Sequence, residues 1–167
     1  MPVSLTAMTE PFFAESPAQL PDRETLLSIS GLEFMQRILR AELPHPPLAR
    51  LMGIRVTSVS EGRVTLKAVA GFDHANTFGA VHGGWYGCVL DTVLGCTVMT
   101  AVPQGRWYTT LEYKVNIARA LPMGTEVEAE ATLDHAGRST AIAHGSLRGV
   151  ADGRLYASGS TTCIILA

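Results

Sequence analysis

The feature that most constrains the fold is an apolar run from residue 83 to about residue 100. The run is too long and too free of breaks to be one strand, so it predicts a helix. Pro103, Gln104 and Gly105 end it. A helix that is apolar nearly all round has to be wrapped by other elements or buried at an interface. We therefore expect the rest of the chain to fold around this segment.

The remaining sequence predicts strands on both sides of the central helix. Between residues 125 and 135, small or aliphatic side chains alternate with Glu and Asp, which is typical of an antiparallel strand with one face in water. Similar patterns, separated by turn signals such as Asp152-Gly153, predict six strands at 54–59, 63–70, 107–118, 125–135, 139–150 and 154–166. In the strand at 107–118, Trp107, Leu111, Val115 and Ile117 are expected on one face. The economical architecture is an α+β fold, with one antiparallel sheet curled around the central helix.

The N-terminal part is expected to differ from this core. The prolines of residues 1–23 predict an irregular arm. The apolar residues between 24 and 43 have the spacing of a helix, with a possible break at Gly31. Pro44, Pro46 and Pro47 end that helix. We divide the chain into an N-terminal arm and helix, residues 1–47, and one main domain, residues 48–167.

Composition narrows the functional classes. The chain has 167 residues, 47% of them hydrophobic, and a net charge of −2 with scattered basic residues, which gives no electrostatic case for nucleic acid or an anionic membrane. No uninterrupted stretch reaches the roughly 18 apolar residues of a membrane span, and the first residues lack a signal-peptide pattern. Three cysteines in apolar settings do not suggest a disulfide framework, so the expected compartment is the cytoplasm.

Asp91 is the only acid in the central run and the leading catalytic candidate. An ionisable group in so apolar a segment is costly to bury, and partial burial would raise its pKa towards that of a general base or nucleophile. Its neighbours on the helix face are mostly small: Gly84, Gly87, Cys88, Leu94 and Gly95. These residues either let a ligand or another chain approach the carboxylate or let the helix pack tightly on the sheet.

Gly83 and Gly84 stand where the helix begins, and a free backbone N–H there suits a developing oxyanion. Gly84 and Asp91 are seven residues apart, about 10 Å along a helix at roughly 1.5 Å per residue. A reacting carbonyl carbon needs both groups within about 3 to 4 Å of the reacting atoms. One helix cannot easily supply both, so we expect a two-fold dimer in which two antiparallel copies of the helix pair Asp91 of one subunit with the glycine turn of the other.

A wider motif contains these residues. Asn76 lies six residues before His82-Gly83-Gly84, and Asp91 lies nine residues after the histidine. This spacing resembles the signature of hotdog-fold acyl-CoA thioesterases, and most closely the phenylacetate-degradation (PaaI-like) branch of the 4-hydroxybenzoyl-CoA thioesterase group. The resemblance spans about residues 48–166. It implies hydrolysis of an acyl-CoA to the free acid and CoA by homodimers that pair into tetramers, with CoA as part of the substrate and no separate cofactor.

The resemblance also implies roles for the motif residues. Asp91 acts as general base towards water or as a nucleophile through an anhydride, and both mechanisms stay open. The amide of Gly83 or Gly84 polarises the thioester carbonyl from the opposite subunit. Asn76 orients the thioester or the water, and His82 holds the geometry of the turn.

Two further positions follow from the same resemblance. Contacts to CoA are expected at the turn formed by Arg138, Ser139 and Thr140. Some relatives carry a hydroxyl one helical turn after the acid to hold the water, and this chain has Gly95 there. Thr92 points elsewhere around the helix, so no residue of the helix is assigned to water positioning.

Other chemistries have less support. The five histidines lack metal-ligand spacing, and Cys88 and Cys96 sit in apolar surroundings that disfavour a thiolate. Two alternatives remain: another acyl-CoA enzyme such as an enoyl-CoA hydratase, and a non-catalytic acyl-CoA-binding protein. Trp85, Tyr86 and Phe78 either line an acyl pocket or belong to the core, and the acyl group itself is left open.

Overall fold

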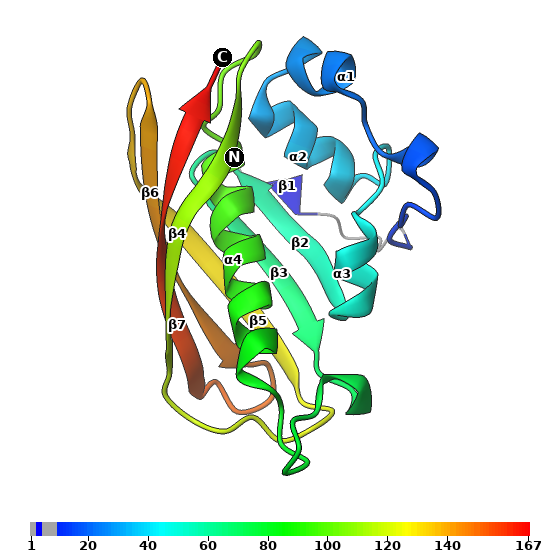
Figure 1. Ribbon diagram of the computed structural model, residues 1–167, viewed down its shortest axis with the longest axis vertical. Helices are drawn as coiled ribbons and strands as arrows, with labels where there is room; N and C mark the ends of the chain where they lie inside the picture. Colours follow the sequence, from blue (N-terminus) through cyan, green and yellow to red (C-terminus); the bar gives the residue numbers. More distant parts are fainter. Residues whose placement is uncertain (1–2, 5–9) are drawn as a thin grey trace.

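A computed structural model describes residues 3–4 and 10–167. A long helix, α4 (Gly83–Met99), packs along one face of a curved antiparallel sheet (Figure 1). The spatial order of the strands is β1-β2-β3-β5-β6-β7-β4. Their bounds are β1 (Val3–Ser4), β2 (Ile54–Ser60), β3 (Arg63–Val69), β4 (Trp107–Ile117), β5 (Glu126–Ala136), β6 (Thr140–Gly149) and β7 (Leu155–Leu166).

The predicted fold class is confirmed: six long strands wrap around a central helix, with helices added at the N-terminal side. The two residues of β1 extend the sheet beside β2, within a region expected to be irregular. Residues 1–2 and 5–9 of that arm lie outside the described part of the chain. Within the described part, no helix is long and apolar enough to cross a membrane.

The helix expected over 24–43 is divided into two, next to the possible break expected at Gly31. The structure has α1 (Arg23–Ser28) and α2 (Gly31–Leu39), because Ser30 ends one segment and caps the next by accepting a hydrogen bond from the Glu33 amide at 3.2 Å. Gly31 is therefore the first residue of α2 and not a kink inside a longer helix. It is also needed for packing, since a Cβ at Gly31 would lie 1.9 Å from the carbonyl oxygen of Met99 in α4.

Three short helices complete the chain: η1 (Pro17–Gln19), α3 (Pro47–Leu51) and η2 (Phe72–His74). The prolines after α2 were expected only to stop a helix. Pro47 instead occupies the first turn of α3, where the missing N–H costs nothing. The proposed division between residues 47 and 48 falls inside this helix.

The core is built on α4. Leu90, Leu94 and Val98 are fully buried against strand residues such as Leu66 and Leu147. A fully buried Leu contributes about 1.5–3 kcal/mol relative to an exposed one. The expectation that the apolar run must be wrapped is therefore met by the inner face of the sheet.

Strand β4 is the edge of the sheet, paired in the described structure with β7 alone. Its pairing steps from Thr110↔Cys163 to Glu112↔Thr162, so Leu111 is an extra residue that forms a β-bulge. A bulge reverses which side chains face the core. Leu111 is consequently 58% exposed, and the expectation that it shares a face with Val115 is wrong.

The bulge decides which β4 side chains contact α4. Before it, Tyr108 and Thr110 face the helix, and Trp107, which was expected on this face, does not take their place. After it, Tyr113 and Ile117 face the helix. The face predicted for Val115 and Ile117 is therefore correct only beyond the bulge.

Candidate active site

The N-terminus of α4 is closed by His82. Its Nδ1 accepts a hydrogen bond from the Gly84 amide at 2.9 Å, so Nδ1 carries no proton in this arrangement. A Cβ at Gly84 would lie 3.0 Å from the same nitrogen, which explains the glycine. Of the two backbone amides predicted as oxyanion donors, the Gly84 amide is thus already hydrogen-bonded to His82. The Gly83 N–H forms no hydrogen bond within the part of the chain that the structure describes.

Asn76 organises the loop that leads into this turn. Its Oδ1 accepts hydrogen bonds from the Phe78 amide at 2.9 Å and the Ala80 amide at 3.1 Å. Gly79, with φ of +77°, completes the tight turn. The side-chain oxygen of Asn76 is therefore used to hold the loop. Only its amide nitrogen is left to act on a substrate.

Asp91 lies half-buried in the middle of α4, as the sequence indicated. Its Oδ1 accepts a hydrogen bond from the Thr110 hydroxyl of β4 at 3.2 Å. Burial raises the pKa of the Asp91 carboxyl above its ordinary value, and the Thr110 hydrogen bond opposes part of that rise. A carboxylate with a raised pKa and a partly open face can accept a proton from water.

Thr110 is the site residue that sequence reasoning missed. The hydroxyl sought one turn after the acid, at Gly95, comes instead from the neighbouring strand. Thr92, also on α4, donates its hydroxyl to the Cys88 carbonyl oxygen at 2.7 Å and is not available to Asp91. The β-bulge at Leu111 turns Thr110 towards the helix.

The glycines beside Asp91 make room for tyrosines of β4. A Cβ at Gly95 would lie 2.7 Å from the Tyr108 hydroxyl oxygen, and one at Gly87 would lie 3.4 Å from that of Tyr113. Tight packing on the sheet therefore accounts for Gly95, whereas a Cβ at Gly87 would make only an ordinary contact. The sequence had left this interpretation open against the approach of a ligand.

The cysteines near the acid are poorly suited to nucleophilic attack. Burial raises the pKa of the Cys96 thiol to about 12 and also raises the pKa values of Cys88 and Cys163. All three are free thiols. Within the described residues, no group of three or more His, Cys, Asp or Glu side chains is arranged to hold a metal ion.

The predicted site residues do not all meet in one chain. Gly83 lies against Ile117 near the end of β4, whereas Asp91 bonds to Thr110 near its beginning. The rise from residue 83 to residue 91 along α4 is about 12 Å. A single carbonyl group cannot contact both.

The predicted CoA turn lies at the other end of the sheet from Gly83 and Gly84 (Figure 1). Arg106 donates a hydrogen bond to the Arg138 carbonyl oxygen at 2.8 Å, and the Ile165 amide donates to the Ser139 carbonyl oxygen at 2.9 Å. These contacts fix the turn between β5 and β6 near the beginning of β4. Arg138, Ser139 and Thr140 keep exposed side chains.

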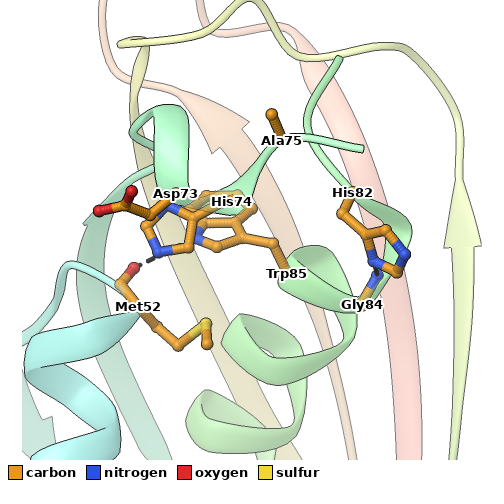
Figure 2. A pocket seen from close by; sticks show the side chains of 7 residues that line it. All are labelled: Met52, Asp73, His74, Ala75, His82, Gly84 and Trp85. Carbon is orange, nitrogen blue, oxygen red and sulfur yellow. Dashed lines mark hydrogen bonds between the residues drawn. The ribbon is translucent and has the colours of Figure 1, made fainter. Parts of the chain in front are cut away.

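A pocket of about 240 Å³ opens beside the N-terminus of α4 (Figure 2). Its lining residues are Met52, Asp73, His74, Ala75, His82, Gly84 and Trp85. Of the three aromatic residues considered for an acyl pocket, Trp85 lines this space while Tyr86 is buried in the core. Phe78 does neither, because its side chain is 92% exposed.

Comparison with known proteins agrees with this geometry. A family model described as the thioesterase superfamily matches residues 78–155. A putative thioesterase of Ralstonia eutropha, a phenylacetic acid degradation-related protein, is 29% identical, with a TM-score of 0.72 over 78% of this chain and 98% of its own. Zebrafish thioesterase superfamily member 2 is 25% identical, with a TM-score of 0.68 over 82% of this chain and 99% of its own. The Escherichia coli PaaI protein shares the fold at 17% identity, with a TM-score of 0.72 over 83% of this chain and 97% of its own. A search of curated protein sequences found no significant match.

The fold and the central helix are those of hotdog-fold proteins, and part of the chain is similar to the thioesterase superfamily. The resemblance to PaaI-like proteins stated from the motif is confirmed, and the matches support a thioester hydrolase.

Proposed function

We propose that the protein hydrolyses acyl-CoA thioesters to the free acid and CoA. The observation that carries the proposal is the half-buried Asp91, held by Thr110 in the middle of an otherwise apolar helix. Several structural neighbours are named as thioesterases or phenylacetic acid degradation proteins, which supports the same chemistry here.

In the proposed reaction, Asp91 takes a proton from water as the water oxygen attacks the thioester carbonyl carbon. The C–S bond breaks, and CoA leaves as a thiolate that is then protonated. Direct attack by the Asp91 carboxylate, followed by hydrolysis of the anhydride, satisfies the same geometry. The Gly83 N–H, at the positive end of α4, donates to the carbonyl oxygen as its charge develops.

We further propose that each site forms across a two-fold homodimer, which the resemblance extends to a dimer of dimers. The open edge of β4 supports this, because Leu111, Tyr113 and Ile117 are 58%, 47% and 49% exposed there. Exposed apolar side chains on an unpaired edge strand favour contact with a second copy. An antiparallel partner helix would bring its Gly83 to the Asp91 of this chain.

The same arrangement makes sense of the predicted CoA turn. The turn between β5 and β6 lies at the end of the sheet where α4 of its own chain finishes (Figure 1). An antiparallel partner helix would begin at that end. The thioester would then lie between Asp91 and the partner's Gly83, with the CoA portion extending towards Arg138, Ser139 and Thr140. The compartment proposed for this reaction is the cytoplasm, because the three cysteines do not suggest a disulfide framework.

The test of the chemistry is release of free CoA from aryl, short-chain and long-chain acyl-CoAs. Asp91→Asn should lower turnover by orders of magnitude with the fold and the oligomer intact. Asp134→Asn, at an exposed carboxylate of β5 that pairs with His144, is the matched control and should retain activity. Equal activity in Asp91→Asn would remove the acid from the mechanism. Tight acyl-CoA binding by the wild type without turnover would instead indicate a binding protein.

The shared site has its own test. An equal mixture of inactive Asp91→Asn and Gly83→Pro chains, unfolded and refolded together, forms half of its dimers from unlike subunits. One of the two sites in each such dimer has both groups intact, so about a quarter of wild-type activity should return. If each site lay within one chain, mixing would restore nothing.

A further inference from the structure

The Tyr108 hydroxyl of β4 lies beside the turn of α4 that follows Asp91. A Cβ at Gly95 would be 2.7 Å from the hydroxyl oxygen, so the hydroxyl occupies the space that a side chain at position 95 would take. Gly95 is four residues after Asp91, and positions four apart on a helix are neighbours, with Cβ atoms about 5–6 Å apart. The Tyr108 hydroxyl is therefore next to the Asp91 carboxylate on the same face of the helix.

This hydroxyl is a donor without a partner in the described part of the chain. It differs in this from the Thr110 hydroxyl two residues further along β4, which donates to Asp91. In that part of the chain, Arg55 Nε and Trp107 Nε1 are the buried side-chain nitrogen or oxygen atoms that lack a hydrogen bond. The Tyr108 oxygen is not among them, so it reaches solvent although its ring packs against the core. A water molecule can therefore bind to it.

The Asp91 carboxylate has one oxygen left for the same water. Its Oδ1 accepts the Thr110 hydroxyl at 3.2 Å, and its Oδ2 forms no hydrogen bond among the described residues. Nor does a direct hydrogen bond join Asp91 to Tyr108, and polar groups more than about 3.5 Å apart are commonly bridged by water. Two O–H···O bonds of about 2.7–2.8 Å each span about 5 Å, which is comparable to the spacing of positions 91 and 95.

The two groups have opposite hydrogen-bonding roles. Burial raises the pKa of the Tyr108 hydroxyl well above its ordinary value, and the nearby Asp91 carboxylate acts in the same direction. Tyr108 therefore keeps its proton through the neutral range and donates, whereas ionised Asp91 accepts. A water between them accepts one hydrogen bond from Tyr108 and donates one to Asp91. Its second lone pair is then left to attack a carbonyl carbon.

We propose that Tyr108 is a positioning residue that orients the reacting water beside Asp91, with its hydroxyl in the space that Gly95 leaves free. The inference rests on the proposed function and adds a residue to the same site. Both routes of that function need a water molecule at Asp91, either to attack the thioester or to hydrolyse the anhydride. A tyrosine that only filled space would work equally well without its hydroxyl.

The first experiment compares Tyr108→Phe with the wild type in steady-state release of CoA. Without its second partner the water is poorly directed, so kcat should fall about 10- to 100-fold while KM stays within about twofold. The acid limb of the pH profile should not move, because burial and Thr110 set the pKa of Asp91. Tyr156→Phe, which removes a hydroxyl bonded to Asp152 at 2.8 Å, is the matched control. It should keep kcat within about twofold.

The second experiment returns a hydroxyl to the same place from the helix. With phenylalanine at position 108, a Cβ at Gly95 would lie 3.5 Å from the ring carbons Cε2 and Cζ, which is an ordinary contact. Tyr108→Phe combined with Gly95→Ser should therefore fold and recover at least about fivefold in kcat over Tyr108→Phe alone. Tyr108→Phe combined with Gly95→Ala fits equally well but supplies no hydroxyl, so it should recover nothing.

Thermal unfolding of the same preparations shows which variants are folded. A folded Tyr108→Phe enzyme with wild-type kcat overturns the inference, and so does equal kcat in the two double variants. If Tyr108→Phe does not fold, Gly95→Ala alone replaces it, because its Cβ displaces the hydroxyl, and wild-type kcat in that variant is again contrary to the inference. These outcomes leave the proposed function intact while Asp91→Asn is inactive. If the wild type releases no CoA from any acyl-CoA, the proposed function itself fails.

Discussion

Replacing Gly83 by proline removes one hydrogen-bond donor and little else. Proline is favoured at the first position of a helix, where its missing N–H has no intrahelical partner. His82, with φ of −64° and ψ of 139°, already has the extended conformation that a residue before proline requires. The change therefore deletes the proposed oxyanion donor while α4 is kept.

The size of the effect follows from the role of that donor. Loss of one oxyanion-hole N–H lowers kcat by about 10²- to 10³-fold, or about 2.7–4 kcal/mol of transition-state stabilisation. Stability should change little or rise by about 0.4–1 kcal/mol, because proline restricts the unfolded chain. Activity and stability should thus move independently.

Steady-state CoA release and thermal unfolding of the same preparations measure both quantities. Gly83→Ala is the control, since it keeps the N–H and places a Cβ 3.5 Å from the Ile117 Cδ1 atom, an ordinary contact. It should stay near wild-type activity. A folded Gly83→Pro enzyme with wild-type kcat would refute the assignment, and the Gly84 amide would then have to leave His82 to take the role.

Three further predictions concern the helix and strand around the acid. Thr110→Val removes the hydrogen bond that lowers the pKa of Asp91, so kcat/KM at pH 7 should fall about tenfold and the acid limb of the pH profile should move to higher pH. The control Thr110→Ser should retain the wild-type profile. Identical pH profiles for Thr110→Val and the wild type would contradict the role of Thr110. Burial raises the pKa of Asp91 above 3.8, so the folded chain loses stability as pH rises from 3.8 through the folded pKa. Asp91→Asn should therefore increase Tm at pH 7 and lose that advantage below pH 3.8, and a lower Tm at pH 7 would show the sign to be wrong. In guanidinium unfolding, Gly95→Ala should lower the free energy of unfolding by about 1–3 kcal/mol, because its Cβ meets the Tyr108 hydroxyl. Gly87→Ala should leave the free energy of unfolding unchanged or raise it by up to about 1 kcal/mol. A larger loss of stability in Gly87→Ala than in Gly95→Ala would contradict this packing.

Local patterns were sufficient for most of the fold. The apolar run predicted α4 to within a residue of Gly83–Met99, and the alternation of residues 125–135 predicted β5. The helix expected over 24–43 is divided next to its possible break at Gly31, because Ser30 caps a new helix there. Nothing in the local spacing required Gly31 to meet Met99. That contact depends on how two distant helices pack.

The candidate active site shows the same division between local pattern and tertiary contact. The separation of Gly83 and Asp91 could be predicted from the sequence because both lie on one helix, and their catalytic roles stay predictions. Thr110 did not follow, because its contact depends on the β-bulge at Leu111. A bulge inserts one residue without changing the composition of the strand. The alternation of residues 107–117 therefore does not indicate which set of alternate side chains faces α4 before the bulge and which set faces it afterwards.

The bulge also explains why the acid lies where it does. With the register that the bulge sets, successive β4 side chains face successive turns of α4: Tyr108 meets Gly95, Thr110 meets Asp91, and Tyr113 meets Gly87. Gly95 lets the strand approach the helix closely at Tyr108, and the Thr110 hydroxyl between the two tyrosines donates a hydrogen bond to the Asp91 carboxylate. Because β4 is the edge of the sheet, this row is also where the proposed second subunit would meet the first. A register without the extra residue would turn Tyr108 and Thr110 away from α4, and the Asp91 carboxyl would lose the hydrogen bond that opposes the rise of its pKa on burial.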